Sequence, residues 1–178
     1  MNSQIPPNGT TASQPTEYRF PTSSEQFRTY IESALGPGTI LIAGVNAALA
    51  QSRNDPPEWT EDVGGYARRF ASAYSERFIA NTAVYGLGEA LHEDTFYHKC
   101  NCAGVMHRFG HVLKESYTAR TESGRTILSF PALVGPYVGG WAASAWYPDR
   151  FGWKDRVLSG TGILISRPLL GLLREFLP

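Results

Sequence analysis

The stretch EDVGGYARRFASAYSERFIANTAVYGLGEAL, residues 61–91, contains the longest helical pattern in the chain. Aromatic residues recur every four positions from Tyr66 to Phe78, and this spacing places them on one side of a helix. Small residues beside them, at Ala67, Ala71 and Ser75, predict a ridge that lets another helix approach closely. We therefore expect an amphipathic helix that packs through this side and carries Arg68, Arg69, Glu76 and Arg77 on its remaining surface.

Shorter helices are predicted on both sides of this one. Thr22–Glu25 fits a capping box, which starts a helix that Gly36-Pro37-Gly38 must interrupt. Residues 39–51 form an apolar helix of about 20 Å at ~1.5 Å per residue, too short to cross a hydrocarbon core of ~30 Å. Further helices are expected at about 105–118 and 154–176. Residues 121–124 are expected to form a turn.

These patterns predict an all-α fold of five to six helices, packed closely through Gly, Ala and Ser, with no substantial β-sheet. Residues 1–21 are polar and contain four prolines, which predicts a disordered leader. Residues 22–178 are expected to form a single helical domain. Basic and acidic residues balance at 16 each, so the electrostatic signature of a nucleic-acid-binding protein is missing and no nucleic-acid partner is expected.

The segment Thr126–Pro148 is the most membrane-like part of the chain. It has no charged residue, contains a GxxxG spacing, and ends in Trp141, Trp146 and Tyr147. We expect a helix here that contacts the lipid membrane, or that associates with a second copy through four small residues: Gly135, Gly139, Gly140 and Ser144.

All histidines and cysteines of the chain lie between positions 92 and 111. His107 and His111 share one helix face at a spacing that suits a shared metal, and the preceding loop adds His98, Cys100 and Cys102. Mixed sulfur and nitrogen ligands favour zinc. The spacing matches no standard zinc motif, and the competing interpretation is that these are ordinary loop and helix-end residues. A disulfide between Cys100 and Cys102 would close a very small ring and is not expected.

Several short motifs resemble an uncharacterised family of small helical bacterial proteins of the Acidobacteria type. They are DPPEW at 55–59, GYARRFAS at 65–72, LHED at 91–94, TESGR at 121–125 and AWYP at 145–148. The resemblance covers roughly two thirds of the chain and implies a protein associated with the envelope or the membrane. The family pattern continues differently after LHED, so a metal at the histidines and cysteines would be a local addition.

The leading hypothesis is therefore a non-enzymatic structural or interaction protein located in the membrane or cell envelope. One alternative is a metal-binding protein that uses the histidines and cysteines. The other is a soluble helical bundle, which would be cytoplasmic.

Overall fold

The computed structural model describes residues 18–100 and 102–176 of the chain. Its long helices are α1 (Ser23–Leu35), α2 (Pro37–Ser52), α3 (Val63–Leu91), α4 (Val105–Glu115), α5 (Phe130–Ala142) and α6 (Trp153–Phe176). Short 3₁₀ turns, η1 (Pro57–Trp59) and η2 (Ala143–Ala145), lie between them, and three strands are present, β1 (Glu93–Asp94), β2 (Thr118–Thr121) and β3 (Thr126–Leu128).

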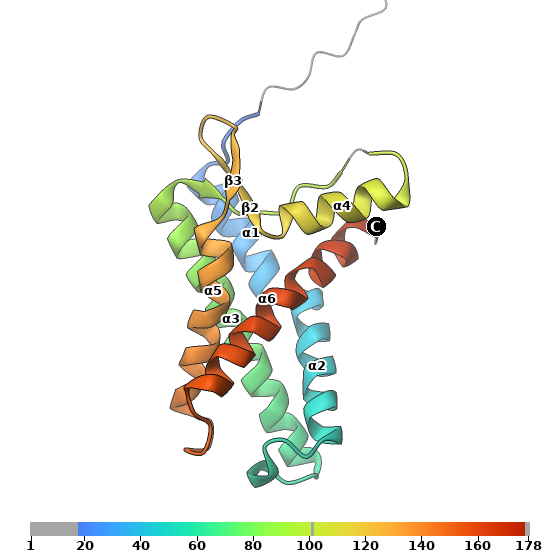
Figure 1. Ribbon diagram of the computed structural model, residues 1–178, viewed down its shortest axis with the longest axis vertical. Coiled ribbons are helices and arrows are strands. Elements are labelled where there is room, and N and C mark those ends of the chain that lie inside the picture. The colour runs from blue at the N-terminus through green and yellow to red at the C-terminus, as the bar shows by residue number, and fades with distance from the viewer. Residues whose placement is uncertain (1–17, 101, 177–178) are drawn as a thin grey trace, which may run out of the picture.

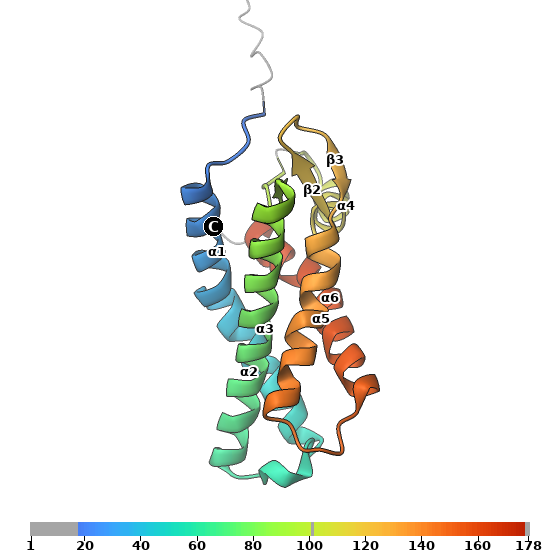
Figure 2. The same cartoon turned by 90° about the vertical axis from the view of Figure 1, so that its left-hand side faces the viewer.

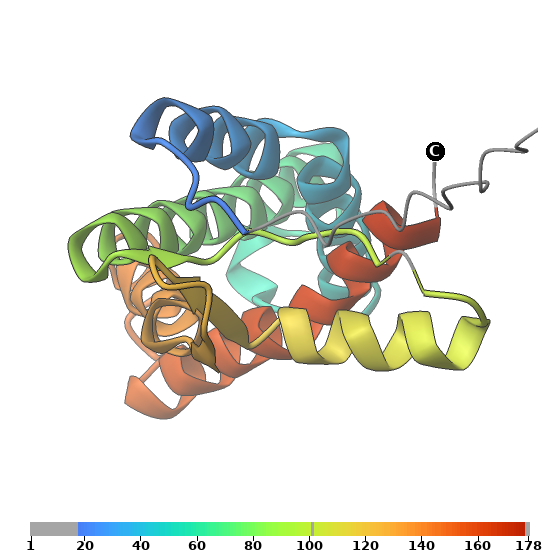
Figure 3. The same cartoon turned by 90° about the horizontal axis from the view of Figure 1, so that it is seen from above.

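The helices α2, α3, α5 and α6 form a bundle, in which α6 crosses the long axis of the molecule obliquely (Figure 1). The strands and α4 lie at one end of this bundle, which we call the sheet end, and η1 and the α5–α6 connection lie at the opposite end (Figures 1 and 2). Helix α4 lies across the sheet end, roughly perpendicular to the long axis, as the view from above also shows (Figure 3). Only part of the predicted leader, residues 18–21, is among the described residues.

The chain is mainly α-helical, as predicted, but it also contains a small sheet that the sequence analysis did not predict. The strands are antiparallel in the order β1-β2-β3, with Glu93 opposite Thr121 and Thr118 opposite Leu128. The turn predicted at 121–124 connects β2 to β3, and Gly124 takes a φ of 76° that favours glycine. The helix expected to reach position 118 ends at Glu115, because the residues after it pair as a strand.

The junction between α1 and α2 is tighter than the sequence suggested. The capping box at Thr22 is present, but only Gly36 separates the two helices. Pro37 occupies the first turn of α2, where its missing N–H costs nothing. A side chain at position 36 would place its Cβ 2.1 Å from the carbonyl oxygen of Glu32, so this position requires glycine. Helix α2 therefore continues along the bundle directly from α1 (Figure 2).

Helix α3 lies where it was predicted, but the opposite face packs into the bundle. Its buried residues are small or polar: Gly65, Arg69, Ser72, Glu76, Arg77, Ala80, Val84 and Gly88. The aromatic residues from Tyr66 to Phe78 are half-buried or exposed, and Ala67 and Ala71 are exposed. The expectation that Arg69, Glu76 and Arg77 lie on the surface was wrong, because each finds hydrogen-bond partners inside the molecule.

The segment expected to be the membrane helix, Thr126–Pro148, is divided into β3, the 13-residue helix α5 and η2. Its glycines pack within the chain. A Cβ at Gly135 would lie 2.4 Å from Val84 of α3, and one at Gly140 would lie 2.8 Å from Gly160 of α6. The predicted close packing through small residues is therefore intramolecular at Gly135, Gly139 and Gly140, whereas Ser144 is exposed.

Candidate functional site

The residues proposed as zinc ligands are spread over a loop and one helix. His98 Nε2 lies 2.9 Å from the carboxylate of Asp94, and His111 Nε2 lies 2.8 Å from the carbonyl oxygen of His98. His107 is exposed on α4. Within residues 18–100 and 102–176, no group of three or more His, Cys, Asp or Glu side chains is arranged to hold a metal ion. Zinc at these positions stays a prediction.

Cys100 and Cys102 are joined by a disulfide, so the sequence argument against a bridge between them was wrong. Their Cα atoms lie 5.2 Å apart, a separation typical of disulfides. Because a metal binds the thiolate form of cysteine, zinc binding here requires that the disulfide first be reduced.

Asp94 organises the junction between the loop, the sheet and the start of the described chain. Its carboxylate accepts hydrogen bonds from Tyr18 Oη at 2.8 Å and from His98. Burial by itself raises the pKa of Asp94, but the hydrogen bonds from His98 and Tyr18 outweigh it and hold the pKa below its ordinary value. The same hydrogen bond, together with burial, raises the pKa of Tyr18.

Helix α4 is anchored to the end of α6 by a pair that the sequence analysis did not identify. Arg108 Nε donates a hydrogen bond of 2.7 Å to the buried carboxylate of Glu175. Tyr97 Oη and the backbone N–H of Cys100, at 3.1 Å, donate to the same carboxylate. Val112 is fully buried beside Gly171 of α6, where a Cβ would lie 2.8 Å from its side chain.

Polar groups also occupy the middle of the bundle between α3, α5 and α6. Glu76 accepts hydrogen bonds from the hydroxyls of Ser72, at 3.1 Å, and Ser159. Arg77 Nη2 donates to Ser166 Oγ at 2.7 Å. Both side chains are buried, and serine hydroxyls of α3 and α6 replace part of the water around them, whereas Arg77 Nε has no hydrogen-bond partner among the described residues.

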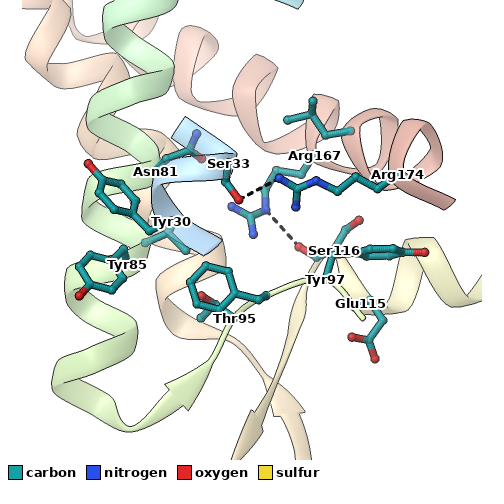
Figure 4. Close-up of a pocket in the computed structure, with 14 residues that line it drawn as sticks. Tyr30, Ser33, Asn81, Tyr85, Thr95, Tyr97, Glu115, Ser116, Arg167 and Arg174 are labelled. Carbon is teal, nitrogen blue, oxygen red and sulfur yellow. Dashed lines mark hydrogen bonds between the residues drawn. The ribbon is translucent and has the colours of Figure 1, made fainter. Parts of the chain in front are cut away.

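The site with the clearest binding chemistry is a cavity of about 90 Å³ near the sheet end, which we call the arginine cavity. It lies between α1, α3 and α6 and is closed by the segment 95–97 and by Glu115 and Ser116. Arg167 and Arg174 of α6 extend their guanidinium groups toward its centre (Figure 4). They are seven residues apart, two turns of the helix, and therefore lie on the same face of α6.

Each arginine in the cavity is fixed by a neutral partner. Arg167 Nε donates to the carbonyl oxygen of Ser116 at 3.1 Å, and Arg174 Nη2 donates to Ser33 Oγ at 2.8 Å (Figure 4). In the part of the chain that the structure describes, neither guanidinium forms a salt bridge. The acid that lines the cavity, Glu115, points away from them and pairs with Arg120 at 3.5 Å.

Arg167 and Arg174 were not predicted as site residues. Their spacing was the available signal, because two arginines seven residues apart in a helix must share a face. The residues that close the cavity, such as Ser33 and Ser116, come from distant parts of the chain, and nothing local in the sequence connects them to α6.

No family model, no curated protein and no solved structure matches this chain. The resemblance to the family of helical envelope proteins therefore stays a prediction.

Proposed function

We propose that this chain is an integral membrane protein with a structural or interaction role, in which α2, α3, α5 and α6 lie within the bilayer. The observation that carries the proposal is the distribution of side chains in the bundle. The buried faces hold small and polar residues, such as Gly139, Glu76 and Arg156, whereas many large apolar side chains face outward. A protein folded by the hydrophobic effect in water has the reverse arrangement, and lipid removes the penalty for exposing apolar groups.

The outward side chains are concentrated on the helices that run along the long axis. Exposed large apolar residues occur on α2 and α6 at Ile40, Leu41, Val45, Leu49, Val157, Leu158, Ile165 and Leu169. Such an extended apolar surface on a monomer marks a contact with a membrane or with another protein. Lipid covers all of these faces at once, which a single protein partner does not do.

The apolar stretches of α2 and α3 are also free of exposed charge. Residues 33–52 of α1–α2 contain no charged residue, and between 70 and 88 of α3 the only charges are the buried Glu76 and Arg77. A helix of 20 residues spans about 30 Å, the thickness of a hydrocarbon core. Two helical segments, Ser23–Ser52 and Trp153–Phe176, are long and apolar enough to cross a membrane. Only 28% of the apolar 18-residue stretch in each segment is buried, whereas a helix in the core of a soluble protein is mostly buried.

Aromatic residues mark the end of this zone opposite the sheet. Trp141 lies in the last turn of α5, Trp146 follows η2, Trp153 begins α6, and all three are exposed. Both helix ends lie at the same end of the bundle (Figure 1). Tryptophan is enriched at membrane–water interfaces, because its ring is apolar and its N–H needs a polar partner.

Helix α4 has the features of a helix that lies in the opposite interface. One side packs on the bundle through Val112 and Glu115, and the exposed apolar residues Val105, Met106, Phe109 and Leu113 occupy a second side. His107 and Lys114 occupy a third. Because α4 lies across the bundle axis (Figures 1 and 3), it would be parallel to the membrane plane.

The proposal is tested by expressing the full chain and asking whether it stays with membranes through a high-salt wash and an alkaline wash. A membrane-embedded bundle remains in the pellet through both washes and requires detergent for extraction. Release by either wash, with a monodisperse protein in detergent-free buffer, would overturn the proposal and favour the soluble helical bundle.

A further inference from the structure

We propose that the arginine cavity binds a phosphate-bearing anion through Arg167 and Arg174. The two guanidinium groups provide positive charge without a carboxylate partner among the described residues. Both side chains are half-buried, and the lost hydration of a guanidinium group is costly unless an anion or a full set of hydrogen bonds compensates for it. A bound anion supplies that compensation.

The choice of arginine favours phosphate over a simple halide ion. A guanidinium group presents its N–H donors in a planar fork that matches two oxygens of a phosphate. Arg167 uses its Nε for Ser116, and Arg174 uses one Nη for Ser33, which leaves N–H groups of both side chains for a ligand. Both hydrogen bonds also fix the side chains in place, so little freedom is lost when the anion binds.

The cavity also offers a neutral donor. Asn81 of α3 lines it, and its side-chain amide forms no hydrogen bond with the described residues. Tyr85, one turn further along the same helix, lines it with its ring, while its hydroxyl points away from the two arginines (Figure 4). A volume of about 90 Å³ suits a small tetrahedral group.

The position of the cavity indicates two sources for the anion. Arg167 contacts the backbone just after α4, and Gly171 packs against α4, so the cavity lies at the level of the proposed interfacial helix. Phospholipid headgroups occupy this level of a bilayer, and basic pockets between membrane helices bind them. Free phosphate from the water phase has the same chemistry. Only the lipid source rests on the proposed membrane location.

The test uses the purified full chain in a non-ionic detergent and measures the thermal unfolding midpoint, Tm. In one arm, inorganic phosphate is compared with chloride at equal ionic strength. In the other, mixed micelles containing phosphatidylglycerol are compared with micelles containing phosphatidylcholine. At a ligand concentration ten times the dissociation constant, we expect Tm to rise by about 3–6 °C. The variants R167Q and R174Q should each reduce the rise, and the double variant should abolish it.

The control is R28Q, which removes an exposed arginine of α1 that pairs with Glu32, and it should keep the full rise in Tm. Because R167Q also changes a contact with Ser116, R167K provides a second variant that keeps the charge and should retain part of the rise. A rise with phosphate identifies the free anion, and a rise with phosphatidylglycerol alone identifies the headgroup. Equal Tm values in both comparisons, or a rise that persists in the double variant, would overturn the anion site whatever the outcome of the membrane washes.

Discussion

At the scale of single residues, Gly139 determines how closely α5 approaches α3. A Cβ at this position would lie 2.3 Å from the carbonyl oxygen of Glu76 and 2.9 Å from the Cβ of Ala80. Backbone cannot move away as a flexible side chain would. We therefore predict that G139A lowers the free energy of unfolding by about 1–3 kcal/mol, measured by thermal unfolding in detergent.

Gly162 of α6 is the matched control, because a Cβ there meets no atom within 4 Å. G162A should be neutral or should stabilise the protein by up to about 1 kcal/mol, through the higher helix propensity of alanine. Equal free energies of unfolding for G139A and G162A would contradict the close approach of α3 and α5 at Gly139.

Asp94 provides a prediction about pH. Its pKa in the folded protein lies below the ordinary value, so the stability that its carboxylate contributes is complete above about pH 4, the pKa of an unfolded aspartate. This contribution is lost as the pH falls through the folded pKa. Tm should therefore decrease between pH 5 and pH 3, and D94N should decrease less steeply over the same range.

The control for this pH series is D149N, which removes an exposed aspartate that forms no ion pair with described residues. It should keep the slope of the unchanged protein. A D94N variant whose Tm falls as steeply as that of the unchanged protein would show that other carboxylates cause the loss of stability in acid.

At the scale of elements, the sequence predicted the helices better than their orientation. The spacing of Tyr66, Phe70 and Tyr74 correctly identified α3 and one of its faces. Periodicity states which residues share a face, but whether that face points inward depends on what surrounds the molecule. The interior of this bundle includes Glu76 of α3 and its partner Ser159 of α6, which lie far apart in the sequence.

The sheet and the cluster around Glu175 were not predictable for a related reason. Strand β1 has two residues and exists only because it pairs with β2, 24 or more residues later. A pattern of alternating residues needs a longer run before it indicates a strand. Glu175 likewise has no local signature, because Arg108 and Tyr97 reach it from another element.

The attachment of α4 depends on this cluster. Removing Arg108 leaves the buried carboxylate of Glu175 without its charged partner, so R108Q should loosen α4 from the end of α6. Hydrogen–deuterium exchange should become faster in α4 and in residues 95–100 and stay unchanged in the middle of α3. H107A, on the exposed side of the same helix, should leave exchange unchanged. Equal exchange in the two variants would mean that Val112 alone holds the helix.

At the scale of the whole molecule, the exposed apolar zone distinguishes a membrane bundle from a water-soluble one. Leu41 lies near the middle of the charge-free run 33–52 and is 56% exposed. Leu128, in β3 at the sheet end, is 66% exposed. The two leucines are alike in chemistry and exposure and differ in their position along the bundle axis, so they form a matched pair.

An arginine at the centre of a membrane helix costs about 2.5–3.5 kcal/mol, whereas on a solvated surface it costs almost nothing. We therefore predict that L41R reduces the fraction of protein that stays with membranes after the alkaline wash and that L128R does not. In water both substitutions would be tolerated, and both would raise solubility by interrupting an apolar surface. If L41R and L128R stayed with membranes to the same extent, the membrane proposal would be contradicted. The outward apolar faces would then be a surface for protein contacts, and lipid would not explain the polar interior.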